Sequence, residues 1–446
     1  MRYLALRTAL RRPARALAMS AGVLALALLP ALLPAGAGAG VARADEAPTT
    51  TKRWKYALVY YMNYDNNLEP CGRPILDMLG RGVVSDDVVV TCQADFTDRE
   101  GLRRYVLTKG KEEVERLAGE DSAATSTLRD YLAWVRDRFP AERYAVIFLD
   151  HGGRLGEMSS DEKPEQPDGP KWLEVVETAK ACAEWRRTLQ GSVELLFLQQ
   201  CGKGTLENYH AFRETAKVVM GSQTIVGAPN TYYEAVLKAV CAEPTLDGEA
   251  LATKIREGDA PNMFTTYTTV REAALAELPA RLEPVLAPLL AREQLALPAR
   301  LRPCFDMAPD EVFYDAKALL EGLYAANELD AAPLADLFAW LERELLAGHR
   351  VSPRRVDVGG TWCGLSIFVP LSAQARARYP HYPIFQETKL DELMARFGQT
   401  LVEAVRARRR AQPGAQPGEQ PGAQPGGGRR RPRGEGRRPR EGTDPI

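Results

Sequence analysis

Two apolar runs decide the fold: RYAVIFLDHGG at residues 143–153 and VELLFLQQCGKG at residues 193–204. Each begins with several Val, Ile, Leu or Phe residues and ends in polar residues and glycine. Such runs are typical of strands buried on both faces of a sheet. The stretch between them, residues 172–189, has the pattern of an amphipathic helix. A strand, a helix and a second strand predict a parallel pair joined by a right-handed crossover, whose carboxyl ends meet at one edge of the sheet.

The same alternation extends outward from this unit. Further strands are predicted at residues 56–62, 87–92 and 218–222, and further helices at residues 128–138 and 205–216. The pattern predicts an α/β protein with a mostly parallel sheet covered by helices on both faces. In such sheets ligands bind at the carboxyl ends of the strands.

The rest of the chain divides by composition. With 446 residues, 45% hydrophobic and 26% charged, the chain is long enough for two folded domains. We expect a catalytic domain at 45–249 and a mainly helical region at 250–405, which has Ala/Leu-rich helices at residues 273–293 and 316–346 and a lone strand at 365–369. Residues 406–446 repeat Gln-Pro-Gly and then Arg-rich runs, a composition typical of disorder.

Residues 1–44 have the pattern of an export signal. Five arginines precede an apolar stretch at residues 18–33, and Ala42-Arg43-Ala44 forms a small-x-small cleavage site. The alternative is a membrane anchor, but Pro30 interrupts the run and about 20 apolar residues are needed to span a bilayer. We expect mature protein to begin near Asp45 and to be secreted, or to lie in the periplasm or cell envelope, with no later membrane span.

Charge and cysteine content limit the function classes. Arginines concentrate in residues 1–44 and 406–446, so the folded part is acidic, which argues against nucleic acid as a partner. The seven cysteines form no CxxC pair and no cluster with histidine, so no metal is predicted. An odd number leaves at least one thiol unpaired in an oxidising compartment.

Cys201 and His151 carry the chemistry that the two runs suggest. A cysteine attacks as the thiolate, and an ordinary thiol needs a nearby base or cation to ionise at neutral pH. His151 ends the first run, whereas the other three histidines follow no buried strand. The backbone N–H groups of Gly152 and Cys201 are the expected oxyanion donors. Either residue alone is more often structural, but their separation of about 50 residues matches the His-to-Cys interval of caspase-type proteases.

Four motifs together resemble the clostripain-like cysteine peptidases, which have the caspase and hemoglobinase fold. They are DHGG at residues 150–153, the end of the run at Cys201, YYMNYDNNLE at residues 60–69 and GLSIFVP at residues 364–370. The resemblance runs from about Trp54 to Pro370. It implies a caspase-like three-layer fold, with His151 as general base, Cys201 as nucleophile and a protein or peptide as substrate.

Specificity departs from the family pattern. The family usually places Asp two residues before the nucleophile, which helps a preference for Arg or Lys, and this chain has Gln199. A neutral amide gives no charge-assisted pair with a guanidinium. We expect Gln199, Ser222 and Gln223 to contact the substrate.

The resemblance also implies maturation by a cut after a basic residue between residues 154 and 171, with Arg154-Leu155 and Lys171-Trp172 as the favoured bonds.

Two interpretations remain. The first is an exported cysteine endopeptidase, with Arg or Lys as the expected residue before the cleaved bond. The second is a catalytically silent caspase-like binding or scaffold protein. No cofactor follows from the residues, although the resemblance leaves calcium dependence open and the acidic run at residues 160–169 is the place considered for it. The oligomeric state is left open.

Overall fold

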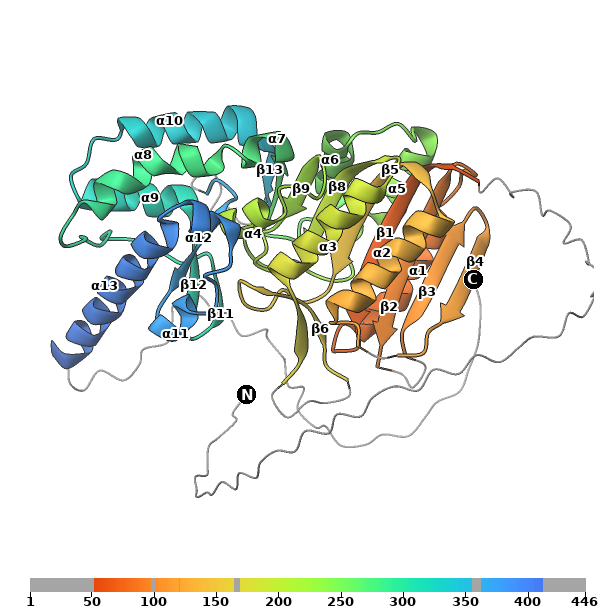
Figure 1. Ribbon diagram of the computed structural model, residues 1–446, viewed down its shortest axis with the longest axis horizontal. Coiled ribbons are helices and arrows are strands. Elements are labelled where there is room, and N and C mark those ends of the chain that lie inside the picture. The colour runs from red at the N-terminus through yellow and green to blue at the C-terminus, as the bar shows by residue number, and fades with distance from the viewer. Residues whose placement is uncertain (1–51, 98–100, 120, 164–168, 355–361, 412–446) are drawn as a thin grey trace, which may run out of the picture. The chain divides into compact units, whose positions relative to one another are not determined.

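A nine-stranded sheet organises the protein in the computed structural model, which describes residues 52–97, 101–119, 121–163, 169–354 and 362–411 (Figure 1). The strands lie in the order β13 (Leu346–Val351), β10 (Thr266–Arg271), β9 (Val218–Gly221), β8 (Ser192–Gln199), β5 (Ala141–Leu149), β1 (Trp54–Tyr64), β2 (Val88–Phe96), β3 (Arg103–Thr108) and β4 (Lys111–Arg116). The central strands β9, β8, β5, β1 and β2 are parallel, and the strands on either side pair antiparallel.

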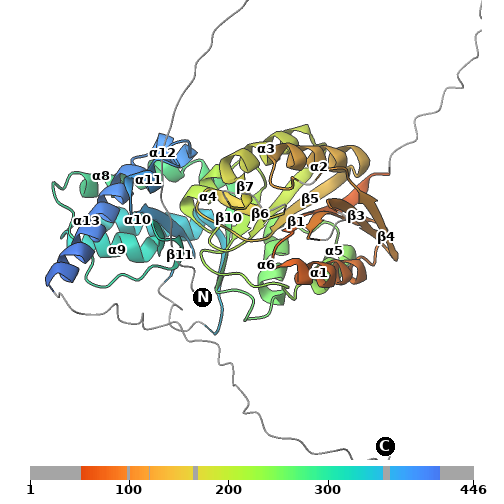
Figure 2. The ribbon, with the colours of Figure 1, turned by 90° about the horizontal axis from the view of Figure 1, so that it is seen from below.

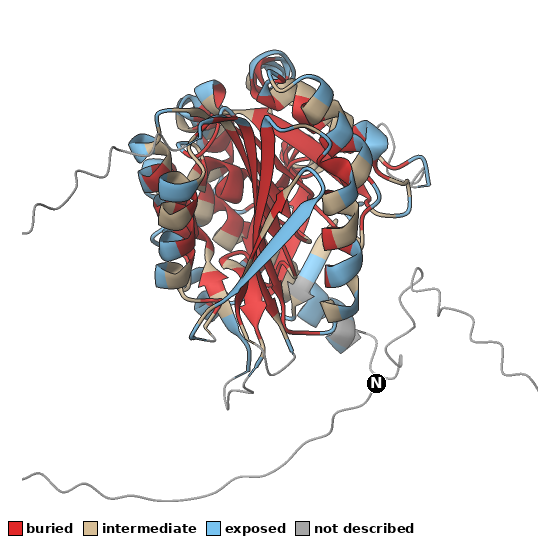
Figure 3. Ribbon diagram, turned by 90° about the vertical axis from the view of Figure 1, so that its right-hand side faces the viewer, coloured by how far each residue is buried: buried red, intermediate tan, exposed pale blue. Residues whose placement is uncertain are grey.

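Helices cover both faces of this sheet (Figure 2). One face carries α2 (Thr125–Arg138), α3 (Val175–Thr188) and α4 (Leu206–Ala211), and the other carries α1 (Glu69–Gly82), α5 (Tyr233–Ala242) and α6 (Gly248–Gly258). Alternate residues of β1 face the two layers, with Val59 and Tyr61 in one hydrophobic cluster and Leu58 and Tyr60 in the other. The buried sheet between its half-exposed helices is visible in Figure 3. The predicted α/β fold with a mostly parallel sheet is confirmed.

A smaller antiparallel sheet accompanies the C-terminal helices. It consists of β11 (Phe305–Ala308), β12 (Glu311–Asp315) and β14 (Ser366–Pro370). The helical elements around it are α7 (Glu272–Leu275), α8 (Leu278–Leu290), α9 (Ala316–Ala326), α10 (Ala332–Trp340), the π-helical turn η1 (Leu341–Leu345), α11 (Ala373–Arg376), α12 (Pro383–Glu387) and α13 (Leu390–Ala411). A bridge between Thr205 and Ser366 links this sheet to the segment that follows β8.

The division of the chain into two domains at residue 249 stays a prediction. The structure contains strands of the main sheet on the C-terminal side of that boundary. Both β10 and β13 lie beyond residue 249 and extend the main sheet. The predicted tail also begins inside α13, which continues to Ala411. Residues 1–44 and the rest of the tail lie outside the described residues. No helix in the described part of the chain combines the length and apolar character that a bilayer crossing needs.

Several predicted elements have different bounds. The helix expected at residues 172–189 begins at Val175, because residues 171–174 form β7 (Lys171–Glu174), which pairs with β6 (Glu157–Asp161). The long helix expected at residues 316–346 is broken into α9, α10 and η1 and ends in β13. Helix periodicity cannot show such breaks, because each piece keeps an apolar face toward the same core.

Candidate active site

The pairing of β5 with β8 places His151 beside Cys201. These neighbouring parallel strands pair Phe148 with Leu198 and Leu149 with Gln199. His151 and Cys201 each lie two residues beyond this last pair, and Gly152 contacts the backbone of Cys201, so the two segments meet at the carboxyl edge of the sheet. The juxtaposition expected from the two apolar runs is therefore present.

Gly152 shows how closely the two strand ends approach. A Cβ atom at Gly152 would lie 1.9 Å from the carbonyl oxygen of Cys201 and 3.1 Å from its backbone nitrogen. Real Cβ atoms never approach backbone atoms so closely, so only glycine fits here. The backbone N–H groups of these two residues thus belong to adjacent segments, as an oxyanion site requires.

The orientation of His151 is set by Asn67, which follows β1. The Nε2 atom of His151 lies 2.7 Å from Oδ1 of Asn67. Because an amide oxygen only accepts hydrogen bonds, Nε2 carries the proton and Nδ1 keeps the free lone pair. Burial lowers the pKa of His151, so the ring is neutral and able to accept a proton near pH 7.

A buried carboxylate fastens the strand end just before His151. Asp150 is 6% exposed and accepts hydrogen bonds from Nδ2 of Asn66 (2.8 Å) and from the hydroxyl (3.1 Å) and backbone N–H of Ser160. The backbone N–H of Ser159 also donates to the carbonyl of His151 at 3.2 Å. These bonds attach the histidine segment to β6, so β6 helps to determine where the imidazole lies.

The thiol of Cys201 lies against the backbone of Val226. The N–H of Val226 donates to Sγ at 3.3 Å, and Sγ lies 3.6 Å from the Val226 carbonyl. Burial raises the pKa of the Cys201 thiol, while the Val226 N–H and the charge of Lys203 lower it. The thiolate therefore depends on these two donors of positive potential and on a base to take the proton.

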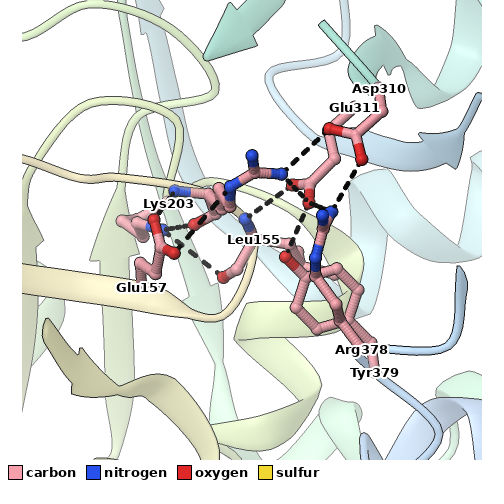
Figure 4. A network of polar contacts seen from close by, with 8 residues as sticks. Leu155, Glu157, Lys203, Asp310, Glu311, Arg378 and Tyr379 are labelled. Atoms are coloured by element: carbon pink, nitrogen blue, oxygen red, sulfur yellow. Dashed lines mark hydrogen bonds and ion pairs between the residues drawn. The ribbon is translucent and has the colours of Figure 1, made fainter. Parts of the chain in front are cut away.

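Lys203 is a buried cation two residues after Cys201. Its side chain is 1% exposed, and its Nζ donates to the carbonyls of Arg154 (2.6 Å) and Leu155 (3.4 Å), as Figure 4 shows. Burial lowers the pKa of Lys203 to about 7, an effect that nearby carboxylates and the Cys201 thiolate oppose. Near neutral pH the ammonium is therefore partly charged and attracts negative charge on Sγ.

The chain segment held by Lys203 is also bound to the C-terminal region. The Arg154 guanidinium pairs with Asp310 (2.9 Å) and Glu311 (2.8 Å), and Arg378 pairs with the same two carboxylates at 2.9 Å (Figure 4). Leu155 is fully buried. The β11–β12 hairpin thus anchors the segment that follows His151.

Gln199 lies in a buried hydrogen-bonded network. Its amide nitrogen donates to Oδ1 of Asn230 and to the hydroxyl of Tyr233 (2.7 Å), and its oxygen accepts from Tyr232. Asn230 in turn donates to Asp259 at 2.7 Å. The polar groups of Gln199 are thus already engaged within the protein.

Ser222 and Gln223, expected to contact substrate, are fully buried. The hydroxyl of Ser222 lies 3.3 Å from that of Thr266, and Nε2 of Gln223 donates to Asp315 at 3.1 Å. Their backbone runs beside the segment that follows Cys201, since the N–H of Gly204 donates to the Ser222 carbonyl at 2.7 Å. Both side chains are therefore engaged within the protein, so the structure does not expose them for the substrate contact that the sequence predicted.

Sequence reasoning assigned no role to Asn67 or Lys203. Asn67 stands inside the quoted YYMNYDNNLE motif, and Lys203 inside the quoted run at residues 193–204. A polar residue three positions after β1, the strand next to β5, was the available signal for Asn67. The buried ammonium of Lys203 is bound by the carbonyls of Arg154 and Leu155, about 50 residues away, a contact that no local pattern reveals.

Comparisons with known proteins agree with this arrangement. Residues 60–279 match the model of the clostripain family of peptidases. The chain is similar to the solved structure of an inactive zymogen of a C11 protease from Parabacteroides distasonis, with 17% identity and a TM-score of 0.57 over 76% of this chain and 99% of that one. It is also similar to a secreted C11 cysteine protease from Bacteroides thetaiotaomicron in complex with an irreversible peptide inhibitor, with 14% identity, a TM-score of 0.57 and the same coverage. No protein with a curated description matches.

The sheet between two helical layers and the likeness to solved C11 proteases define a caspase-like fold, and the match to the clostripain family model defines the class, a cysteine peptidase. Within that class the chain belongs to the clostripain family, whose model covers the segments that contain both His151 and Cys201. The family resemblance of the sequence motifs is confirmed.

The charge of Lys203 predicts a measurable shift in thiol reactivity. Lys203→Met keeps the length of the side chain but removes the charge, so we expect the apparent pKa of Cys201 to rise. Each pKa unit lowers the thiolate fraction about tenfold below that pKa. The measurement is the rate of iodoacetamide alkylation of Cys201 between pH 5.5 and 9, followed by mass spectrometry.

The control is Lys180→Met, which removes an exposed lysine of α3.

An independent check is the pH dependence of stability. Folding lowers the pKa of Lys203, so the unfolded chain binds more protons than the folded protein above about pH 7. The free energy of unfolding of the parent should therefore increase, relative to that of Lys203→Met, as pH rises from about 7 toward the pKa of lysine in the unfolded chain. An unchanged alkylation profile in Lys203→Met would exclude this electrostatic role.

Proposed function

We propose that the protein is an exported endopeptidase that cleaves peptide bonds with Cys201 as nucleophile and His151 as general base. The observation that carries the proposal is the parallel pairing of β5 with β8, which brings both residues to one sheet edge. The peptide substrate follows from the cysteine peptidase class. The assignment of the two roles is ours.

The proposed reaction starts from a neutral pair, since burial raises the pKa of Cys201 and lowers that of His151. Nδ1 of His151 takes the thiol proton as Sγ attacks the carbonyl carbon of the scissile bond. The imidazolium then gives this proton to the leaving amine as the C–N bond breaks, which leaves an acyl group on Sγ. Water, deprotonated by Nδ1, hydrolyses the thioester and restores the thiol.

The oxyanion formed in each addition step requires donors fixed in advance. We assign this role to the backbone N–H groups of Gly152 and Cys201, whose segments are in direct contact. Backbone donors of this kind need no reorganisation as charge develops, which is why they stabilise the transition state strongly. The anchoring of the Arg154 segment to Lys203 and to the C-terminal hairpin keeps Gly152 in place.

Replacing the nucleophile gives the direct test. We expect Cys201→Ala to abolish peptidase activity and covalent labelling by an irreversible peptidyl probe. His151→Ala should lower activity about 10²–10⁴-fold, since it removes the general base and acid. Activity is measured with a mixed peptide library, and the labelled residue is identified by mass spectrometry.

Cys241→Ala is the matched control. Cys241 is also half-buried and also accepts a hydrogen bond from a backbone N–H, that of Val84 at 3.4 Å. It should keep full activity. Activity in Cys201→Ala, or a probe attached to another cysteine, would refute the assignment and favour a silent binding protein or a different nucleophile.

Cleavage after Arg or Lys is proposed only as a weak preference. Neither polar atom of Gln199 is free, because Asn230, Tyr232 and Tyr233 engage both ends of the amide. Asp259, behind Asn230, is only 3% exposed and accepts hydrogen bonds at both oxygens. A basic substrate side chain at this site would therefore bind neutral hydrogen-bond acceptors and no free carboxylate. Such acceptors favour the planar guanidinium of Arg over the ammonium group of Lys.

A charge at position 199 should sharpen this preference. Gln199→Glu keeps the size of the side chain and adds a carboxylate, so we expect kcat/KM for substrates with Arg before the cleaved bond to rise about tenfold or more. Substrates with Leu at that position serve as the control in the same preparation. An equal change for both substrates, or an acidic optimum in the parent, would contradict the proposed preference.

Export and maturation complete the proposal. Residues 1–44 have the pattern of a signal, and the similar protease from Bacteroides thetaiotaomicron is described as secreted. Of the two bonds considered for maturation, Arg154-Leu155 is held by ion pairs and has a fully buried Leu155. Lys171, in contrast, is exposed at the start of β7. We therefore propose a cut after Lys171.

N-terminal sequencing of protein from its native host tests both steps. The expected result is one chain that begins near Asp45 and, in active protein, a second that begins at Trp172. Cys201→Ala should yield only the first chain, because it cannot cut itself. A chain that begins at Met1, or a new terminus at Leu155, would contradict export or the choice of bond, respectively.

A further inference from the structure

The turn that begins at Cys201, residues 201–204, is bonded to the segment that follows β9. The N–H of Gly202 donates to the carbonyl of Thr224 at 2.9 Å, and the N–H of Gly204 donates to the carbonyl of Ser222 at 2.7 Å. The two segments are thus neighbours along their backbones. The position of the cysteine turn therefore depends on where the segment after β9 lies.

The same segment carries the hydrogen-bond donor to the thiol. The N–H of Val226 donates to Sγ of Cys201 at 3.3 Å. The two backbones are also in close contact, because a Cβ atom at Gly204 would lie 2.6 Å from the backbone nitrogen of Gln223. A displacement of residues 222–226 would therefore move the cysteine turn and the donor to Sγ together.

The side chain of Gln223 fixes this segment to β12 of the small C-terminal sheet. It is fully buried, and its Nε2 donates to Oδ2 of Asp315 at 3.1 Å. A carboxylate only accepts hydrogen bonds, so the amide nitrogen of Gln223 must be the atom that faces it. Hydrogen bonds to an ionised acceptor are about twice as strong as those between neutral groups. This contact therefore ties residues 222–226 firmly to β12.

Asp315 is itself held on both oxygens. It ends β12 and is 1% exposed; its Oδ1 accepts the N–H of Ala318 at 3.1 Å, and its Oδ2 also accepts the N–H of Cys363 at 2.9 Å. Burial raises the pKa of Asp315, and the hydrogen bonds from these two residues and from Gln223 lower it. Because a buried carboxylate that loses a donor is disfavoured, Asp315 is a rigid attachment point.

The other two strands of the small sheet also contact the cysteine turn. In β14, Ser366 pairs with Asp315 of β12, and its N–H donates to the carbonyl of Gly204 at 3.0 Å. In β11, the ring of Phe305 lies against Gly202, where a Cβ atom would be 2.2 Å from the ring. Gly202 has a φ of +68°, a conformation that favours glycine. The small sheet thus borders the turn along its length.

We infer that Gln223 and Asp315 are positioning residues for the nucleophile, through which β12 holds the cysteine turn and the Val226 N–H in place. Both side chains are buried and bonded to each other, so neither is available to the substrate. Gln223 thus has a role different from the substrate contact expected from the sequence. The part of this role that concerns turnover rests on the proposed function of Cys201, whereas the effect on the thiol does not require catalysis.

Gln223→Met tests the role of the amide. Methionine keeps the approximate size of the buried side chain but donates no hydrogen bond. With a peptide that the parent cleaves, we expect kcat to fall about 10–100-fold at nearly constant KM, because a small misplacement of a reacting group has an effect of this size. The apparent pKa of Cys201, from iodoacetamide alkylation between pH 5.5 and 9, should rise, because the Val226 N–H that lowers it is displaced.

Asn327→Leu is the matched control. Asn327 is also a buried amide of the C-terminal region, at the opposite end of α9 from Asp315, and it donates to the carbonyls of Ala296 (3.1 Å) and Leu323 (2.8 Å). The control variant should lower Tm but leave kcat and the alkylation profile of Cys201 unchanged. If Gln223 had only a structural role, both variants would show this same result.

Asp315→Asn changes the other partner and decides the question if Gln223→Met does not fold. An amide offers one acceptor and one donor in place of two acceptors, so it cannot accept from both Gln223 and Ala318. The variant should shift kcat and the alkylation profile in the same direction. Hydrogen exchange of the amides of residues 202–204, followed by mass spectrometry, should also become faster than in the parent.

The two kinds of readout separate the positioning role from the proposed function. An unchanged alkylation profile and unchanged exchange of residues 202–204 in a folded variant would overturn the inference, and so would a loss confined to Tm or KM. A shifted alkylation profile in a protein whose activity survives Cys201→Ala would refute the proposed nucleophile and still support the positioning of the Cys201 thiol.

Discussion

The parallel pairing of β5 with β8 is the constraint on which the rest of the site depends. Its last pair, Leu149 with Gln199, stands two residues before His151 and Cys201, and Gly152 lies so near the Cys201 carbonyl that no side chain fits between them. A slip by one residue would turn every side chain of the strand to the opposite face and destroy both cores as well as the site. The same apolar residues that stabilise the sheet therefore also align the reactive groups.

Burial makes the charged forms of the candidate site's groups unfavourable. It pushes the thiol, the imidazole and the Lys203 amine toward their neutral forms. The charge that develops on Sγ must then be stabilised by a few fixed groups, the N–H of Val226 and the Lys203 ammonium among them. Because the surroundings are apolar and rigid, each of these groups has a larger effect than it would have in water.

The sequence could predict the sheet, and with it the neighbouring positions of His151 and Cys201, for a common reason. Runs of apolar residues in the order strand, helix, strand fix the topology locally, and His151 and Cys201 directly follow two such runs. The partners that orient and charge them could not be predicted. Asn67 and Lys203 act through contacts with segments 84 and about 50 residues away, respectively. Pattern arguments also missed β10 and β13, whose polar and small residues resemble a loop until the sheet edge pairs with them.

The C-terminal region binds the segment that follows Gly153, through ion pairs of Arg154 with Asp310 and Glu311. The segment after Gly153 must leave the sheet edge, yet its position controls a donor of the proposed oxyanion site. Within the described residues it is held from two sides, by Lys203, which follows Cys201 by two residues, and by Asp310 and Glu311 of the β11–β12 hairpin. Ion pairs at an exposed loop contribute little, but Glu311 is almost completely buried and shared by two arginines and the Tyr379 hydroxyl. Removing one partner would leave a buried charge unpaired, which is far more costly than losing a surface pair. The C-terminal region thus serves as part of the scaffold of the candidate active site, and separating it from the sheet would release the segment that follows Gly153.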